Sequence, residues 1–186
     1  MDFLASPPLI VFLTCILVGA AFFDLRFHKI PNLLTYPAML MSLLYHGVTH
    51  GTPGILFSLE GLGAGMGFLI LFYLLGGMGA GDVKLLGAAG SALGPLGALN
   101  AFLFTAFSGG ICSLLLILVH RAQFKALLVR CGLMLKMFIA TGSVVRIAAS
   151  SDNEKLPKMA YGLHISCGTL FTLFWHFSYN RFPIDF

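Results

Sequence analysis

The stretch PLIVFLTCILVGAAFFDLRFHK, residues 8–29, decides the fold class of this chain. It is apolar and uncharged up to Phe23, and it then turns polar at Asp24, Arg26 and Lys29. A helix needs about 20 apolar residues to cross the hydrocarbon core of a bilayer. The sequence therefore predicts a membrane-spanning helix that begins at Leu4 or Pro8 and ends at a polar cluster.

The whole composition supports a membrane protein. Of the 186 residues, 58% are hydrophobic and 10% are charged, and the mean hydropathy is +0.93. Soluble domains carry about 25% charged residues. We expect one transmembrane domain, residues 1–186, without a soluble module. The start carries Asp2 and lacks the basic segment of a signal peptide, so it is predicted to be a retained first helix.

The pattern of apolar runs predicts an all-α, polytopic protein with six transmembrane helices. Pro31 favours a helix start after the first polar cluster. Gly and Pro interrupt the apolar runs at residues 46–54 and 94–95, and a glycine-dense break covers residues 76–84. The predicted spans are residues 4–23, 33–45, 55–75, 83–93, 96–119 and 161–177.

Residues 120–158 mix apolar stretches with seven basic side chains. On a helix, Arg121, Lys125 and Lys136 fall within about 60° of one another. A charge in the middle of a span costs at least ~2.5–3.5 kcal/mol on insertion scales. For residues 124–149 we therefore favour a basic interfacial helix between spans five and six over a seventh span.

The basic residues also predict the orientation. With six spans, ten of the 11 Lys and Arg lie in the loops after spans one, three and five. The positive-inside rule places these loops in the cytoplasm and both termini outside. The net charge of +4 then reflects topology and contact with anionic membrane lipids, not binding of nucleic acid.

Two acidic residues mark the candidate site. Asp24 directly follows span one and Asp82 directly precedes span four. Two spans lie between them, so both carboxylates are on the same side of the membrane in either orientation. Two carboxylates close together share a proton, and such a pair can activate water and donate to a leaving amine. This predicts peptide hydrolysis without metal or cofactor.

The residues around Asp82 suit this chemistry. Gly79 and Gly81 leave room for a substrate strand beside the main chain. Lys84 either favours ionisation nearby or is only a topology charge. Arg26 and Lys29 are most simply positive-inside anchors, with contact to a substrate or an acidic partner as the alternative.

These two motifs resemble those of the type IV prepilin peptidases. Gly79-x-Gly81-Asp82-Val-Lys84 resembles the GxGD signature. The stretch from Asp24 through Arg26 and Lys29 to Ile30-Pro31-Asn32 resembles the first site of the family. Pro157 and Tyr161-Gly162 resemble a third, weaker element, although the spacing here is wider than usual.

The resemblance implies a bacterial inner-membrane aspartyl peptidase that removes the leader of pilin-like precursors at the cytoplasmic face. It implies Asp24 and Asp82 as the catalytic pair, and contact with pilus or secretion machinery. The bifunctional members carry paired CxxC motifs in an N-methyltransferase domain, which this chain lacks. The chain therefore resembles the short, peptidase-only members that serve Flp/Tad pili.

Other interpretations remain open. Asp24 alone suits the interfacial end of a helix, and Asp82 alone suits a helix N-cap. A small ion-coupled transporter is one rival, because carboxylates within membranes often mark ion paths. A non-catalytic secretion-assembly factor is another. Glu60 is given no catalytic role. The His and Cys residues show no metal-ligand spacing, and HExxH and GxSxG are absent.

Overall fold

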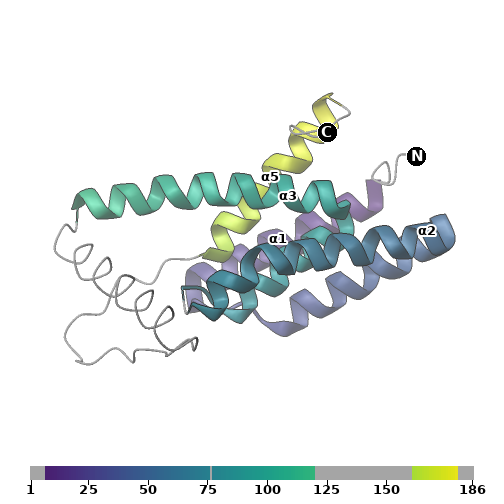
Figure 1. The fold of residues 1–186 in the computed structure, drawn as a ribbon, viewed down its shortest axis with the longest axis horizontal. Coiled ribbons are helices and arrows are strands. Elements are labelled where there is room, and N and C mark those ends of the chain that lie inside the picture. The colour runs from purple at the N-terminus through teal and green to yellow at the C-terminus, as the bar shows by residue number, and fades with distance from the viewer. Residues whose placement is uncertain (1–6, 76, 120–160, 180–186) are drawn as a thin grey trace, which may run out of the picture.

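The computed structural model describes residues 7–75, 77–119 and 161–179. Its helices are α1 (Pro7–Phe27), α2 (Asn32–Leu74), α3 (Ala80–Val119) and α5 (Tyr161–Tyr179) (Figure 1). The predicted all-α fold is confirmed. The basic segment 120–158, including the predicted interfacial helix 124–149, lies outside the described residues.

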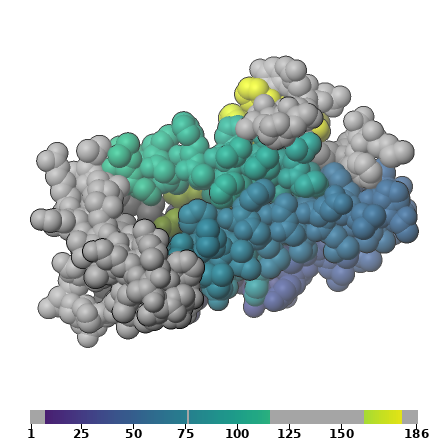
Figure 2. Space-filling model, viewed as in Figure 1, coloured from purple at the N-terminus to yellow at the C-terminus, as the bar shows by residue number. Residues whose placement is uncertain are grey.

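Three of these helices are long and apolar enough to cross a membrane: Pro8–Phe27, Asn32–Leu74 and Ala80–Leu115. Their outer faces carry large apolar side chains, and Leu33, Val48 and Phe107 are 84%, 85% and 70% exposed. An exterior of this kind suits contact with lipid. Figure 2 shows that α2 and α3 form most of the described surface on one face of the molecule. The chain is a polytopic helical membrane protein.

Helix α2 folds back on itself at Gly51. A straight helix of this length would extend about 65 Å. Yet Ile30, just before α2, contacts Gly81, just after it: a β-carbon at Gly81 would lie 3.1 Å from Cβ of Ile30. Gly51 makes the bend possible with φ 65° and ψ −144°, a conformation that other residues rarely adopt. The bend lies within the predicted turn 46–54.

Helix α3 bends in the same way at Gly94, which has φ 73° and ψ −177°. Pro95 opens the second arm, where its missing N–H does least harm. That proline cannot donate the helical hydrogen bond to the carbonyl of Ser91. Instead, Oγ of Ser58 in α2 donates to this oxygen at 2.8 Å. The bend predicted at residues 94–95 is therefore found, and a neighbouring helix supplies the donor that the bend removes.

Glycines let the second arm of α2 approach the first arm of α3 backbone to backbone. A β-carbon at Gly61 would overlap the carbonyl oxygen of Gly90, and one at Gly65 would overlap that of Leu86. Small residues allow this close approach of helices in lipid. The pairs run in opposite directions along the chain, so the two arms are antiparallel. The core between the helices is filled by side chains that are 2% exposed or less: Leu13, Leu17, Leu85, Leu86, Leu93 and Ile165.

This contact can be tested with two glycines of α2. We predict that Gly61→Ala lowers the thermal unfolding midpoint of the purified protein, because the new methyl group meets the Gly90 backbone, which cannot move aside. The expected cost is about 1–3 kcal/mol or more. Gly63→Ala is the control, because nothing lies within 4 Å of a β-carbon there. Equal midpoints for the two variants would contradict the contact.

Candidate active site

Asp24 lies in the last turn of α1. His28 ends this helix in a left-handed conformation, φ 49°, and its N–H donates to the carbonyl of Asp24 at 2.9 Å. The Asp24 side chain is only 5% exposed. The C-terminal end of a helix is electrostatically unfavourable for a carboxylate. The Asp24 carboxylate therefore needs a hydrogen-bond donor from outside α1.

That donor lies in the first turn of α5. The backbone N–H of Leu163 donates to Oδ2 of Asp24 at 3.3 Å. Gly162 lies directly against the same carboxylate: a β-carbon there would be 2.9 Å from Oδ2. The N-terminus of a helix, with its free N–H groups and positive dipole end, is a favourable place for an anion. The Asp24 carboxylate therefore uses the N-terminus of α5 to offset the unfavourable end of α1.

Asp82 lies in the first turn of α3. Its Oδ2 accepts a hydrogen bond from the N–H of Gly79 at 3.0 Å, and its own N–H donates to the carbonyl of Gly79 at 3.1 Å. This reciprocal pair resembles a capping box. The side chain is 7% exposed. A capping role thus accounts for one carboxylate oxygen of Asp82 and is compatible with chemistry at the other.

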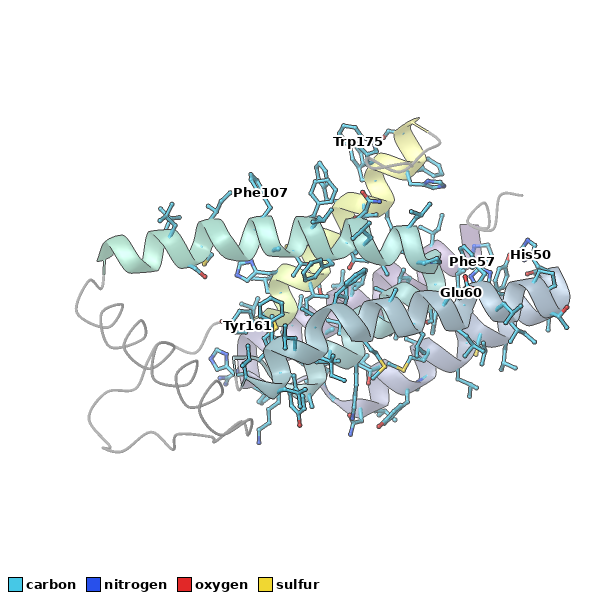
Figure 3. All side chains as sticks on the ribbon, viewed as in Figure 1. His50, Phe57, Glu60, Phe107, Tyr161 and Trp175 are labelled. Carbon is cyan, nitrogen blue, oxygen red and sulfur yellow. The ribbon has the colours of Figure 1, made fainter. Side chains whose placement is uncertain are left out.

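The fold brings Asp24 and Asp82 to the same end of the molecule. Ile30 contacts both Gly81, which directly precedes Asp82, and Gly162, which lies against the Asp24 carboxylate. Tyr161 begins α5 next to Gly162. Tyr161 marks this end in Figure 3, whereas His50 and Phe57 lie at the other end, by the bend of α2. Among the described residues, neither carboxylate forms an ion pair. Two buried acids, one from α1 and one from α3, thus lie at the end of the molecule where α5 begins.

Lys84 does not contact either carboxylate. Its Nζ donates to Oδ1 of Asn32 at 3.0 Å and lies 4.9 Å from the centre of the Tyr36 ring. The lysine and Asn32 therefore join the first turn of α3 to the first turn of α2. Pro31 precedes α2 in an extended conformation, φ −65° and ψ 137°.

The remaining predicted residues lie around the pair. Arg26 and Lys29 are exposed, and the Arg26 guanidinium lies 5.9 Å from the centre of the Phe27 ring. Glu60 is exposed on the second arm of α2 and lies near His50 and Phe57, at the end opposite to Tyr161 (Figure 3). Within the described ranges, no group of three or more His, Cys, Asp or Glu side chains is placed to hold a metal ion.

Sequence reasoning left three contributors without a role at the site: Ile30, Gly162 and the Leu163 amide. Ile30 contacts both Gly81 and Gly162. Ile30 and Gly162 both belong to the motifs described above, so the sequence could have indicated them. The Leu163 amide could not be predicted, because a backbone N–H does not depend on the type of residue.

The model of the type IV leader peptidase family matches residues 11–114, more than half of the chain. The chain belongs to the type IV leader peptidase family. The resemblance inferred from the two motifs is confirmed, and the matched region contains both Asp24 and Asp82. Comparisons with curated proteins and with solved structures give no significant match.

Gly162 offers a test of how Asp24 is held. We predict that Gly162→Ala lowers peptidase activity on the order of 100-fold, the effect of misplacing a reacting group by about 1 Å. The methyl group would meet Oδ2 of Asp24 at 2.9 Å and Cδ1 of Ile30 at 2.7 Å. The Asp24 carboxylate ends a short side chain that can turn away from the new methyl group, so the carboxylate moves while the fold survives.

Purified variants would be compared for peptidase activity and thermal unfolding. Gly110→Ala is the control, because nothing lies within 4 Å of a β-carbon there. A Gly162→Ala protein with wild-type activity would show that Asp24 need not occupy this position.

Proposed function

We propose that this leader peptidase is a membrane aspartyl endopeptidase in which Asp24 and Asp82 form the catalytic pair. It removes the leader peptide of pilin-like precursors at the cytoplasmic face of the bacterial inner membrane. The observation that carries the proposal is that Asp24 and Asp82 are both buried, with Ile30 in contact with the glycine beside each of them, Gly162 and Gly81. Membership in a peptidase family supplies the reaction class.

The mechanism follows from two acids that share one proton. The ionised carboxylate takes a proton from a water molecule, and the oxygen of that water attacks the peptide carbonyl carbon. The protonated carboxyl donates its proton to the carbonyl oxygen. The tetrahedral intermediate collapses when the first carboxyl gives the proton that it took from water to the amine nitrogen and the C–N bond breaks. One hydroxyl of the intermediate returns its proton to the second carboxylate, which restores the pair. The peptide is hydrolysed without a covalent intermediate.

The surroundings of the pair support this chemistry. Two backbone amides, from Gly79 and Leu163, hold one oxygen of each carboxylate. Such fixed donors orient the side chains without a large reorganisation during the reaction. Gly79 is exposed, which leaves the main chain next to Asp82 accessible to an extended substrate strand.

We also propose six membrane spans: α1, each arm of α2 and of α3, and α5. The arms of α2 on either side of Gly51 are about 28 and 34 Å long, which suits a hydrocarbon core of about 30 Å. The first arm of α3 is only about 21 Å long. A short arm that begins beside Asp82 leaves the catalytic end recessed below the membrane surface, where water must still reach it.

The family membership favours a peptidase over an ion-coupled transporter. A non-catalytic assembly factor is the remaining rival, and activity of the two aspartate variants distinguishes it.

We predict that Asp24→Asn and Asp82→Asn each abolish leader removal, because an amide can neither accept the proton of water nor share one with its partner. The loss should be at least about 1000-fold, in the range of a missing acid or base. Membranes carrying each variant would be incubated with a pilin-like precursor, and the shortened product followed by mass. Glu60→Gln is the control, since it changes an acid away from the pair and should cut normally. Cutting by either aspartate variant at the wild-type rate would refute the catalytic pair.

The topology makes a separate prediction. In a variant without the four native cysteines, Thr52→Cys at the α2 bend should react with a membrane-impermeant thiol reagent added to intact cells. Lys29→Cys should react only after the inner membrane is opened, because it lies on the cytoplasmic side. The reverse pattern, or equal labelling of both positions, would contradict the proposed orientation.

A further inference from the structure

We propose that Ile30 is a positioning residue whose side chain sets the separation between the Asp24 and Asp82 carboxylates. The inference rests on the proposed function and adds to it a residue that acts through its contacts with the neighbours of the two carboxylates.

Ile30 fills the space between the first turns of α3 and α5. On one side, a β-carbon at Gly81 would lie 3.1 Å from Cβ of Ile30 and 3.5 Å from its carbonyl oxygen. On the other side, a β-carbon at Gly162 would lie 2.7 Å from Cδ1 of Ile30. Gly81 directly precedes Asp82. One side chain therefore contacts the neighbour of each carboxylate.

Ile30 approaches Gly162, on the Asp24 side, more closely than it approaches Gly81. The β-carbon position of Gly162 is 2.7 Å from Ile30 and also 2.9 Å from Oδ2 of Asp24. Gly162 thus lies between the Ile30 side chain and the Asp24 carboxylate, with no side chain of its own to absorb a change. Any movement of Ile30 toward α5 is passed to the turn whose amide, at Leu163, holds Asp24.

The local sequence makes Ile30 a stiff spacer. Pro31 follows it and restricts its backbone to extended conformations. Its branched β-carbon limits rotation about χ1. The side chain is half-buried and packs against the core, so its position is fixed from several sides. A flexible side chain of the same size would not hold two helix ends at a constant distance.

A purely structural role for Ile30 has to be separated from a positioning role. Ile10 provides the comparison, because it is also partly buried against the same core but lies in the half of α1 remote from Asp24. Ile30→Val and Ile10→Val remove the same methyl group. In Ile30 this is Cδ1, the atom that faces Gly162.

The test measures kcat and KM for leader cleavage by the purified full-length chain in lipid nanodiscs. We expect Ile30→Val to lower kcat about tenfold, a fraction of the effect of a full 1 Å misplacement, with KM unchanged within about twofold. Ile10→Val should leave both constants unchanged. Equal kinetics for the two variants, or an increase in KM alone, would overturn the proposal.

A double variant tests the geometry directly. Removing Cδ1 of Ile30 relieves one of the two overlaps that Gly162→Ala creates. Gly162→Ala should therefore reduce kcat about tenfold less in the Ile30→Val background than in the wild type, since contacting residues do not act additively. Multiplicative losses would mean that the two residues act independently, and the proposal would fail.

The Asp24→Asn and Asp82→Asn proteins, measured alongside, distinguish a failure of the catalytic pair from a failure of the positioning role of Ile30. If they still cleave, or if the wild type does not, the catalytic pair is wrong and the role of Ile30 falls with it. If they are inactive while Ile30→Val behaves like Ile10→Val, the catalytic pair stands and only the positioning role is wrong.

Discussion

The hydrogen bond from the Leu163 amide to the Asp24 carboxylate is the interaction on which the site depends. Asp24 is almost fully buried, and a buried carboxylate is costly unless hydrogen bonds or charges compensate it. Its own helix presents the wrong end of its dipole. The first turn of α5 provides the missing compensation, from a point 139 residues further along the chain. Moving α5 away would leave an uncompensated acid, so the same bond that orients Asp24 also holds α5 in the bundle.

The bends at Gly51 and Gly94 complete this arrangement, because they return the chain to the end of the molecule at which Asp24 lies. A bend interrupts the helical hydrogen bonds, so backbone groups beside it need other partners. At α3, Oγ of Ser58 donates to the carbonyl of Ser91, which Pro95 leaves without its helical donor. The glycine contacts between α2 and α3 then set Asp82 at a fixed height relative to Ile30. The position of one catalytic candidate is thus determined by backbone packing far from it.

The sequence predicted the parts of this architecture that depend on composition and order along the chain. Apolar runs predicted membrane helices, Gly and Pro predicted both bends, and the parity of spans predicted that Asp24 and Asp82 share a side. The contacts of Lys84 were not predictable, because its partner Asn32 is 52 residues away and no periodic pattern links them. The Leu163 amide was invisible for a simpler reason: every residue but proline has one. The two interpretations of Asp82 were a helix N-cap and a catalytic acid. Asp82 is not the N-cap, because α3 begins at Ala80; it accepts the N–H of Gly79 from within the first turn, which leaves a catalytic role open.

The choice of partners for the two acids has a chemical consequence. A lysine or arginine in contact with a carboxylate favours its ionised form, and two such pairs would keep both acids ionised throughout a reaction. A pair of acids that works by acid–base catalysis needs one proton that can pass from one carboxylate to the other. Here the described residues hold the carboxylates with backbone amides, whose charge does not change, and the ammonium of Lys84 is directed to Asn32 and the Tyr36 ring. The backbone amides orient both side chains, and in the proposed mechanism they would leave a proton free to move between the two carboxylates.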